Sequence, residues 1–444
     1  MKFKKICVMG LGYIGLPTAS TFATHGIEVL GVDVNQRVIQ TLRNGEIHIH
    51  EPGLRTLVQA AIKSGNLRIS DHPEEADAFI IAVPTPFRDA DHKSQELDEK
   101  TPSDTDYPLA DLSYVIAAAG AIAPCLKSGN LVVLESTSPP RTTEDVVRPI
   151  LERSGLKAGI DFHLAYSPER VLPGQILREL IENARVIGGV NSASAQAGHD
   201  LYSTFVRGEI IQTTATTAEM VKLMENTTRD VNIAIANEFS RLAEHFGIDV
   251  WEAIELANLH PRINILRPGP GVGGHCISVD PWFLVEAAPE LTPLIHTARR
   301  VNDAQPAHVV QRIEQTIGEL KGKRVAVLGL AYKPDVDDLR ESPAVEVAHI
   351  MIAAGAEVIA FEPYRTDSQI TDIPAADSLE AAIGESDILV LLVAHTSFKN
   401  LDPAQVASMT NARTVFDTVN IWDPVHWGAA GFNIHRLGVG IWNT

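Results

Sequence analysis

The sequence predicts an α/β protein with two doubly wound, Rossmann-like domains, joined by a long central helix and a helical middle domain. Short apolar runs alternate with helical stretches from Ile6 onward, the alternation stops over residues 216–258, and it restarts at Lys323. The chain has 444 residues, enough for about three domains at roughly 150 residues each. We therefore expect domains over residues 1–213, 214–318 and 319–444.

The first domain is expected to hold a parallel sheet. Continuous apolar runs bounded by turn residues indicate strands that are buried on both faces, with helices on either side. A helical stretch over 14–25 follows the first run, and the polar residues 88–107 are expected to form an exposed loop. The expected strands are 6–9, 28–32, 78–83, 131–134 and 163–166.

The middle of the chain predicts one long helix. Residues 216–258 contain no proline and only Gly247 as a breaker, so we expect a helix that splits near Gly247 and offers a dimer surface. The third domain then repeats the strand–helix alternation, with a helix over 345–354. Its expected strands are 324–328, 357–361 and 387–393.

Composition narrows the function classes. Lys and Arg number 37 against 56 Asp and Glu, a net charge of -19, which argues against a general nucleic-acid or anionic-membrane binder. No apolar run is long enough to span a membrane, and Gly10 and Gly12 interrupt the first run too early for a signal peptide. Three cysteines without CxxC spacing form no disulfide framework. A soluble cytoplasmic protein is expected.

The hexapeptide 10–15, Gly-Leu-Gly-Tyr-Ile-Gly, has the G-x-G-x-x-G spacing of a dinucleotide-binding turn. Its glycines allow a tight turn, and the helix start favours a pyrophosphate. Asp33 ends the second strand, where a carboxylate can bind a ribose 2′-hydroxyl and repel a 2′-phosphate. This indicates NAD over NADP, although Arg37 stands nearby. The alternative is a glycine turn required only for packing.

A glycine-rich segment, 269–281, places Cys276 just before Asp280-Pro281, which is typical of a helix N-cap followed by a first-turn proline. A thiol near a helix N-terminus is exposed and favours the reactive thiolate. The segment lacks the Lys-Ser/Thr pair of a phosphate-binding P-loop. His275 and Cys276 alone give weak support for zinc, so no metal is expected. The alternative for Cys276 is a buried apolar residue, the favoured interpretation for Cys7 and Cys125.

Further polar residues fall where α/β proteins bind ligands. Lys222, Asn226 and Arg229 share one helix face, for which a solvated stripe is the alternative. Segments 135–137 and 166–170 follow strands at their carboxyl ends. Lys333 and Arg340 supply cations that suit a phosphate-bearing ligand in the third domain. Their alternative is a solvated loop paired with Asp335, Asp337 and Asp338.

These motifs together resemble the UDP-glucose/GDP-mannose dehydrogenase family of nucleotide-sugar 6-dehydrogenases. They occur in order over nearly the whole chain, and the segments 169–174, 260–264 and 270–283 most resemble the members that act on UDP-N-acetyl-D-mannosamine (UDP-ManNAc). One departure is the long polar insertion after Phe87. The motifs are Gly-Leu-Gly-Tyr-Ile-Gly-Leu-Pro from Gly10, Val-Pro-Thr-Pro from Val83, Glu-Ser-Thr-Ser from Glu135, Ser-Pro-Glu-Arg from Ser167, Lys222 with Asn226, Gly-Gly-His-Cys276 and Tyr-Lys-Pro from Tyr332.

The resemblance implies a four-electron oxidation of a sugar C6 hydroxyl by two NAD, through a thiohemiacetal and a thioester on Cys276. It implies a homodimer or higher homo-oligomer, with Arg262 reaching the substrate of a neighbouring subunit. The implied catalytic residues are Cys276, Lys222, Asn226, Asp280, Glu169 and Thr137. The implied NAD-binding residues are Gly10, Gly12, Tyr13, Ile14, Gly15, Asp33, Thr85, Thr137 and Arg340. The implied substrate-binding residues are Arg170, Val171, Lys222, Asn226, Arg229, His260, Arg262, Gly273, Tyr332 and Lys333.

Several alternatives stay open from sequence. Within the family, the substrate could instead be UDP-GlcNAc or UDP-glucose. A two-electron 3-hydroxyacid dehydrogenase shares a dinucleotide domain and a Lys/Asn pair, but it needs neither Cys276 nor a second α/β domain. An NAD-binding protein without turnover leaves Lys222, Asn226 and Cys276 unexplained.

Overall fold

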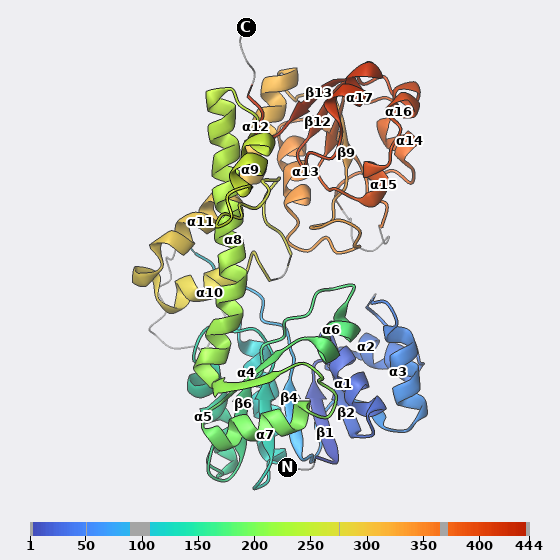
Figure 1. Ribbon diagram of the computed structural model, residues 1–444. Coiled ribbons are helices and arrows are strands. Elements are labelled where there is room, and N and C mark those ends of the chain that lie inside the picture. The colour runs from blue at the N-terminus through green and yellow to red at the C-terminus, as the bar shows by residue number, and fades with distance from the viewer. Residues whose placement is uncertain (1–2, 50, 89–106, 275, 365–371, 441–444) are drawn as a thin grey trace. The chain divides into compact units, whose positions relative to one another are not determined.

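The computed structural model describes residues 3–49, 51–88, 107–274, 276–364 and 372–440. The chain forms two compact units, Met1–Glu225 with Trp282–Pro289 and Asn226–Pro281 with Glu290–Thr444. Each unit is built around one sheet with helices on its faces (Figure 1). Most of the expected polar loop, 88–107, and all of His275 lie outside the described residues.

Among the described residues, the first unit has an eight-stranded sheet in the order β3-β2-β1-β4-β5-β6-β7-β8. Strands β1, β2, β4, β5 and β6 are parallel to one another, so their carboxyl ends lie at the same edge. The strands are β1 (Lys5–Met9), β2 (Glu28–Val32), β3 (Leu67–Ser70), β4 (Ala78–Ile81), β5 (Leu131–Leu134), β6 (His163–Tyr166), β7 (Arg185–Gly189) and β8 (Ile210–Thr214).

Strand β7 departs from the expected parallel arrangement. It runs antiparallel to β6, with Gly189 opposite Ala165 and Gly188 opposite Tyr166. Its sequence, Arg-Val-Ile-Gly-Gly, lacks the continuous apolar run from which the other strands were expected. Both glycines are required by space, because a Cβ at Gly188 would overlap the Thr214 carbonyl and one at Gly189 would overlap the backbone that starts the next helix.

Helices cover both faces of this sheet (Figure 1). Ile6 and Val8 of β1 pack into a buried cluster on one face with Leu16, whereas Cys7 packs on the other face with Phe79. The predicted doubly wound α/β architecture is therefore confirmed. The helices are α1 (Gly15–Thr24), α2 (Gln36–Arg43), α3 (Leu54–Lys63), α4 (Ser113–Ile122), η1 (Ala123–Cys125), η2 (Thr142–Val147), α5 (Arg148–Leu151), η3 (Glu152–Ser154), α6 (Ile176–Glu182) and α7 (Ser192–Tyr202).

The predicted long helix is present as α8 (Ala215–Phe246), which begins in the first unit and continues into the second. The helix ends before Gly247, whose φ is +70°, and a second helix, α9 (Val250–Asn258), follows, so the predicted split is confirmed. No helix in the described residues is both long and apolar enough to cross a bilayer. The helices that follow are α10 (Asp280–Ala287), η4 (Pro289–Leu291), α11 (Pro293–Asp303) and α12 (Gln305–Ile317).

The sheet of the second unit, in the described residues, has five parallel strands in the order β10-β9-β11-β12-β13. Apolar clusters cover both of its faces, one with α13 and one with Trp422 and Trp427. The strands are β9 (Arg324–Leu328), β10 (Glu357–Phe361), β11 (Ile388–Leu391), β12 (Thr414–Asp417) and β13 (Asn433–Arg436). The helices are α13 (Pro343–Ala353), α14 (Leu379–Ile383), α15 (Thr396–Lys399), α16 (Pro403–Met409) and α17 (Pro424–Ala429).

Candidate active site

The glycine turn 10–15 connects β1 to α1, and its glycines differ in what surrounds them. Gly10 has a φ of +90°, and a Cβ there would lie 2.5 Å from the Ala82 carbonyl oxygen. A Cβ at Gly15 would overlap the Gly10 carbonyl, whereas one at Gly12 would meet nothing within 4 Å. Two glycines are therefore needed for packing, and the third leaves open backbone beside the start of α1, as a pyrophosphate requires.

Asp33 follows β2 and is half-buried beside this turn. Its Oδ2 accepts a hydrogen bond from the Leu11 backbone N–H at 2.9 Å, and its Oδ1 accepts one from Asn35 at 2.8 Å. Each carboxylate oxygen has a second lone pair, so a ribose hydroxyl can still donate to it. Tyr13 and Ile14 are half-buried in the same turn. The residues present thus fit a dinucleotide.

Two further candidates lie after β4 and β5. Thr85 is buried, and its hydroxyl donates to the Thr137 carbonyl oxygen at 2.6 Å. The Ser136 hydroxyl donates to the Val83 carbonyl oxygen at 2.6 Å, which ties the same two loops together again. Because β1, β2, β4 and β5 are parallel neighbours, the structure brings Thr85 and Thr137 to the sheet edge that carries the glycine turn and Asp33.

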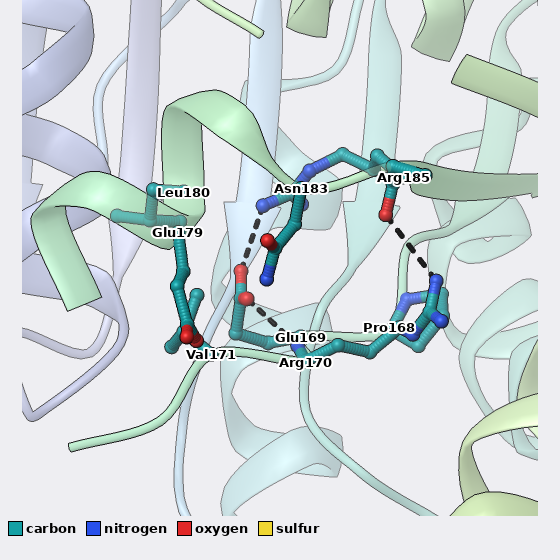
Figure 2. A pocket seen from close by; sticks show the side chains of 9 residues that line it. Pro168, Glu169, Arg170, Val171, Glu179, Leu180, Asn183 and Arg185 are labelled. Carbon is teal, nitrogen blue, oxygen red and sulfur yellow. Dashed lines mark hydrogen bonds and ion pairs between the residues drawn. The ribbon is translucent and has the colours of Figure 1, made fainter. Parts of the chain in front are cut away.

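Glu169 follows β6 at this edge and is held by two donors (Figure 2). The Arg170 backbone N–H donates to its Oε1 at 2.7 Å, and Nη2 of Arg185 donates to its Oε2 at 2.7 Å. The other side of the Arg185 guanidinium, Nη1, donates to Ser167 Oγ at 2.9 Å and to Glu135 Oε1 at 3.2 Å. The side chains of Arg185, Glu135 and Glu169 are 5%, 0% and 7% exposed, so one buried cation serves two carboxyl groups.

The Glu135 carboxyl group is less well supplied with hydrogen-bond donors than that of Glu169. The Tyr202 hydroxyl donates to its Oε1 at 2.5 Å, but its buried Oε2 has no hydrogen-bond partner among the described residues. Burial, which outweighs the attraction of Arg185, raises the pKa of Glu135 to about 7. Arg185, the first residue of β7, was not expected from the sequence, because β7 lacks the continuous apolar run that marks the other strands.

Arg170 and Val171 line a small pocket between the segment after β6 and α6 (Figure 2). The Arg170 guanidinium pairs with Glu225 of α8 at 2.7 Å and donates to the Ala184 carbonyl oxygen at 3.2 Å. Arg170 thereby ties the predicted substrate segment to α8. Lys222, one helical turn before Glu225, is 8% exposed.

In the second unit, the glycine-rich loop packs tightly against the loop that follows β9. A Cβ at Gly273 would overlap the Glu341 carbonyl, and one at Gly274, where φ is +85°, would lie 2.6 Å from the Tyr332 ring. The Gly269 backbone N–H donates to Asn237 Oδ1 of α8 at 3.1 Å. The glycines are therefore required for the close packing of this loop, and not only for its backbone flexibility.

Cys276 is exposed at the end of this loop. Its carbonyl oxygen accepts the Asp280 backbone N–H at 2.8 Å, in a turn that leads directly into α10. Helix α10 begins at Asp280 itself, one residue earlier than the expected N-cap position implies. Asp280 is buried, and its Oδ2 accepts a hydrogen bond from Asn226 Nδ2 at 2.5 Å, which brings these two predicted residues together.

The other two cysteines differ from Cys276. Cys7 is fully buried, and burial raises the pKa of its thiol to about 12. Cys125 is partly buried, and burial also raises the pKa of its thiol. Among the described residues, no group of His, Cys, Asp and Glu is arranged to hold a metal ion.

The remaining predicted substrate residues are less enclosed. Arg229, His260 and Arg262 are exposed. Lys333 is half-buried, with its ammonium nitrogen 5.6 Å from the centroid of the Tyr332 ring. Arg340 forms a bidentate pair with Asp338, at 2.9 and 2.7 Å, which is the solvated ion pair that the sequence offered as its alternative.

The loop that carries Lys333 is anchored by two residues that the sequence analysis missed. Glu362, directly after β10, is buried, and its Oε2 accepts the backbone N–H groups of Leu330 at 2.7 Å and Ala331 at 3.0 Å. His395 lies 3.1 Å from the same oxygen through Nε2 and accepts the Asp335 N–H at Nδ1. Since Nδ1 is an acceptor, Nε2 carries the proton that is donated to Glu362.

Comparison with known proteins agrees with this arrangement. The chain matches the UDP-glucose/GDP-mannose dehydrogenase family in its NAD binding domain over residues 4–206, its central domain over 216–304 and its UDP binding domain over 326–424. A UDP-N-acetyl-D-mannosamine dehydrogenase of Methanococcus maripaludis is 46% identical over 99% of this chain and 98% of its own. An NDP-N-acetyl-D-galactosaminuronic acid dehydrogenase of Ralstonia nicotianae is 50% identical over 95% and 96%.

Among solved structures, a UDP-D-ManNAc dehydrogenase from Pyrococcus horikoshii superimposes with a TM-score of 0.87 at 40% identity, covering 98% of this chain and 99% of that one. All three domains of one family are thus matched in order, and the likeness extends over nearly the full length of the chain. The chain therefore belongs to the UDP-glucose/GDP-mannose dehydrogenase family and is an NAD-dependent nucleotide-sugar dehydrogenase.

Proposed function

We propose that this chain oxidises the C6 hydroxyl of UDP-ManNAc to the uronic acid and so supplies a precursor of surface polysaccharides. Relatives that carry this activity in their names support the sugar. The observation that carries the chemistry is the exposed Cys276 thiol, placed one turn before a buried Asp280 that binds Asn226. The Ralstonia relative favours an N-acetylgalactosamine-type sugar as a second candidate, because it is 50% identical. UDP-GlcNAc and UDP-glucose remain the further alternatives within the family.

We assign NAD binding to residues 1–213, dimerisation and the cysteine loop to 214–318, and UDP-sugar binding to 319–444. NAD, when bound, supplies the hydride acceptor for both oxidations. The open backbone at Gly12 and the start of α1 suit its pyrophosphate, and Asp33 suits its adenosine ribose. Tyr13, Ile14, Thr85 and Thr137 would complete this site, with Arg340 as a further contact.

In the first oxidation, hydride leaves C6 and the C6 hydroxyl loses its proton. Lys222 assists this proton release through hydrogen bonding at the C6 oxygen. Its buried side chain lies on α8 four residues before Asn226, so both project from one helix face. An ammonium group and a side-chain amide are both hydrogen-bond donors, and they suit an oxygen that gains negative charge during reaction.

In the second oxidation, the Cys276 thiolate forms a carbon–sulfur bond to the C6 aldehyde. The resulting thiohemiacetal gives up hydride from C6 and a proton from its hydroxyl, which leaves a thioester. Water then attacks the thioester carbonyl. Glu169, Thr137 or Asp280 orders that water.

Substrate binding is assigned to residues from both units. Lys333 provides the cation for the diphosphate, and Tyr332 and Gly273 line the loop beside it. Arg170, Val171, Lys222, Asn226 and Arg229 complete the set on the first unit and α8. His260 and Arg262 are exposed after α9, which suits a contact made in a neighbouring subunit.

A homodimer is supported by an apolar stripe on α8. Ile235, Phe239, Leu242 and Phe246 recur at helical spacing and are 40%, 40%, 49% and 67% exposed. Such a row of large apolar side chains on one helix face is typical of a helix that packs against a second copy. Sedimentation analysis of Phe239→Glu should show dissociation to monomers. A variant that keeps the wild-type mass would contradict this interface. We also infer a cytoplasmic location, because three cysteines without CxxC spacing give no disulfide framework.

The proposed reaction is tested by supplying a panel of UDP-sugars and counting NADH per carboxylate formed. We expect UDP-ManNAc to be the best substrate, with two NADH per product. Faster turnover of UDP-glucose or UDP-GlcNAc would overturn the sugar but not the family.

The role of Cys276 is tested by substitution in the same assay. Cys276→Ala should allow only slow first oxidation, and Cys276→Ser should lose overall turnover, because its ester hydrolyses far more slowly. Cys125→Ala is the matched control and should behave as wild type. Normal two-NADH turnover by Cys276→Ala would sink the mechanism.

A further inference from the structure

The buried cluster behind Glu169 joins four elements of the first unit at one guanidinium. Arg185 comes from β7, Glu135 from the end of β5, Glu169 from the segment after β6, and Tyr202 from α7. The guanidinium carbon lies 4.4 Å from the centroid of the Tyr202 ring, so stacking fixes the plane of the fork. Arg185 is therefore immobilised on three sides.

The cluster holds one more carboxyl group than it has cations. If both glutamates were ionised, a net negative charge would be buried, which is costly at a site whose three charged side chains are at most 7% exposed. The two glutamates are not equivalent. Both oxygens of Glu169 receive a charged or backbone donor, whereas Oε2 of Glu135 is buried and has no partner in the part of the chain that the structure describes.

We propose that Arg185 is a positioning residue, which fixes the Glu169 carboxylate for water activation by holding it and Glu135 on one buried guanidinium. This inference rests on the proposed role of Glu169 in thioester hydrolysis. In that step water oxygen bonds to the acyl carbon while Glu169 takes one of its protons. The carbon–sulfur bond then breaks, releasing the Cys276 thiolate and the carboxylic acid, which ionises.

Glu135 sets the pH range over which this works. The charged and titratable groups that face it are Arg185, Tyr202 and Glu169. While Glu135 is neutral, Arg185 is bound mainly by Glu169. Since burial raises the pKa of Glu135 to about 7, its ionisation at higher pH draws the guanidinium away and loosens Glu169.

The test compares Arg185→Lys with wild type, using UDP-ManNAc and NAD. A lysine cannot bridge two carboxyl groups as a planar fork does. We expect a burst of two NADH per active site, then turnover slowed about tenfold or more. A covalent sugar adduct on Cys276 should accumulate in the intact-protein mass spectrum. The apparent KM should fall together with kcat, because a late step has become limiting. Arg148→Lys, which alters an exposed ion pair with Glu152, is the matched control and should show none of this.

Glu135→Gln keeps the proposal falsifiable if Arg185→Lys does not fold. It mimics the neutral carboxyl, so hydrolysis at pH 7 should stay within about twofold of wild type. The decline above pH 7 that we expect for wild type should vanish in this variant. The inference is overturned if Arg185→Lys slows all steps equally without an adduct, or if Glu135→Gln keeps the wild-type pH profile. Glu169→Gln distinguishes failure of the proposed function from failure of the inference about Arg185. It should accumulate the adduct on Cys276. If it does not, the role proposed for Glu169 in hydrolysis is wrong, whatever Arg185 does.

Discussion

The two sheets start in the same way and then diverge. In the first, Gly10 follows β1 with a φ of +90° and Asp33 follows β2; in the second, Gly329 follows β9 with a φ of +90° and Glu362 follows β10. In both, the acid accepts the backbone N–H of the residue after the glycine, Leu11 or Leu330. The resemblance between the two turns therefore extends to their hydrogen bonds.

The difference lies in what the turn leaves open. After the first turn, Gly12 is exposed and α1 begins at once, so a ligand can reach the helix start. After the second, Ala331 is buried and donates to Glu362, and α13 begins only at Pro343. The same arrangement thus leaves the start of α1 open in the first unit, whereas in the second it anchors the loop that bears Lys333.

The largest effect is expected from removing the second acid. Glu362→Ala leaves His395 and two backbone N–H groups without their buried acceptor, which should destabilise the fold by about 3 kcal/mol or more in urea unfolding. Titration with NAD should give the wild-type affinity. Glu357→Ala, which changes an exposed glutamate at the start of β10, should cost far less. Equal losses for the two variants would show that Glu362 is not an anchor.

Removing the first acid should affect binding more than stability. Asp33→Ala should weaken NAD binding by roughly 10- to 100-fold, or about 1.4–2.8 kcal/mol, and narrow the gap to NADP. Fluorescence titration with both dinucleotides measures this. Asp71, exposed after β3, is the control and should be neutral when changed to Ala. Wild type that uses NADP as well as NAD would contradict the assignment of Asp33.

Buried carboxyl groups in the two units should respond oppositely to pH. Burial raises the pKa of Glu135 from 4.5 in the unfolded chain to about 7 in the folded protein. The stability that its neutral form contributes is therefore fully present below about pH 4.5 and is lost as the pH rises towards 7. For Glu362, burial opposes ionisation, but the His395 and backbone donors hold its pKa below the ordinary value. Its contribution is therefore lost only in acid.

We expect Glu135→Gln to flatten the fall in stability between pH 5 and pH 8 by on the order of 1–2 kcal/mol. Thermal unfolding at several pH values measures the slope, which is independent of any constant cost of the substitution. An unchanged slope would mean that Glu135 does not titrate in this range.

The smallest effect is expected at Lys333, a single cation beside Tyr332. Lys333→Ala should raise the KM for the UDP-sugar about five- to tenfold and leave kcat nearly unchanged, provided that the contact is equal in ground and transition states. Lys399→Ala, which changes an exposed lysine of α15, is the matched control. A lower kcat with unchanged KM would remove Lys333 from substrate binding.

The sequence pattern was sufficient to predict a strand where that strand is buried on both faces of its sheet. The runs 78–81, 131–134 and 388–391 are wholly apolar and wholly buried, and all three were expected as strands. Strand β7 was not expected, since it carries Arg185 and two glycines, and neither was β8, whose residues are half-buried or exposed. Periodicity reports burial, so a strand that lacks uniform burial gives no such signal.

For the site, local motifs could be read but long-range pairs could not. The turn 10–15 and Asp33 are linked by fixed motif spacing. Arg185 meets Glu135 and Glu169 from 50 and 16 residues away, and His395 meets Glu362 from 33. Those distances along the chain are set by topology, not by a motif. The catalytic and binding roles therefore stay predictions that the variants above can test.

One helix carries both Lys222 and Asn226, and the boundary between the two units falls between Glu225 and Asn226. Four residues of α-helix span about 6 Å, whatever happens at either end. The rise of the helix backbone therefore fixes the spacing between the Cα atoms of Lys222 and Asn226. Inserting a single residue between them would rotate one against the other by about 100° and displace it by about 1.5 Å while preserving every side chain.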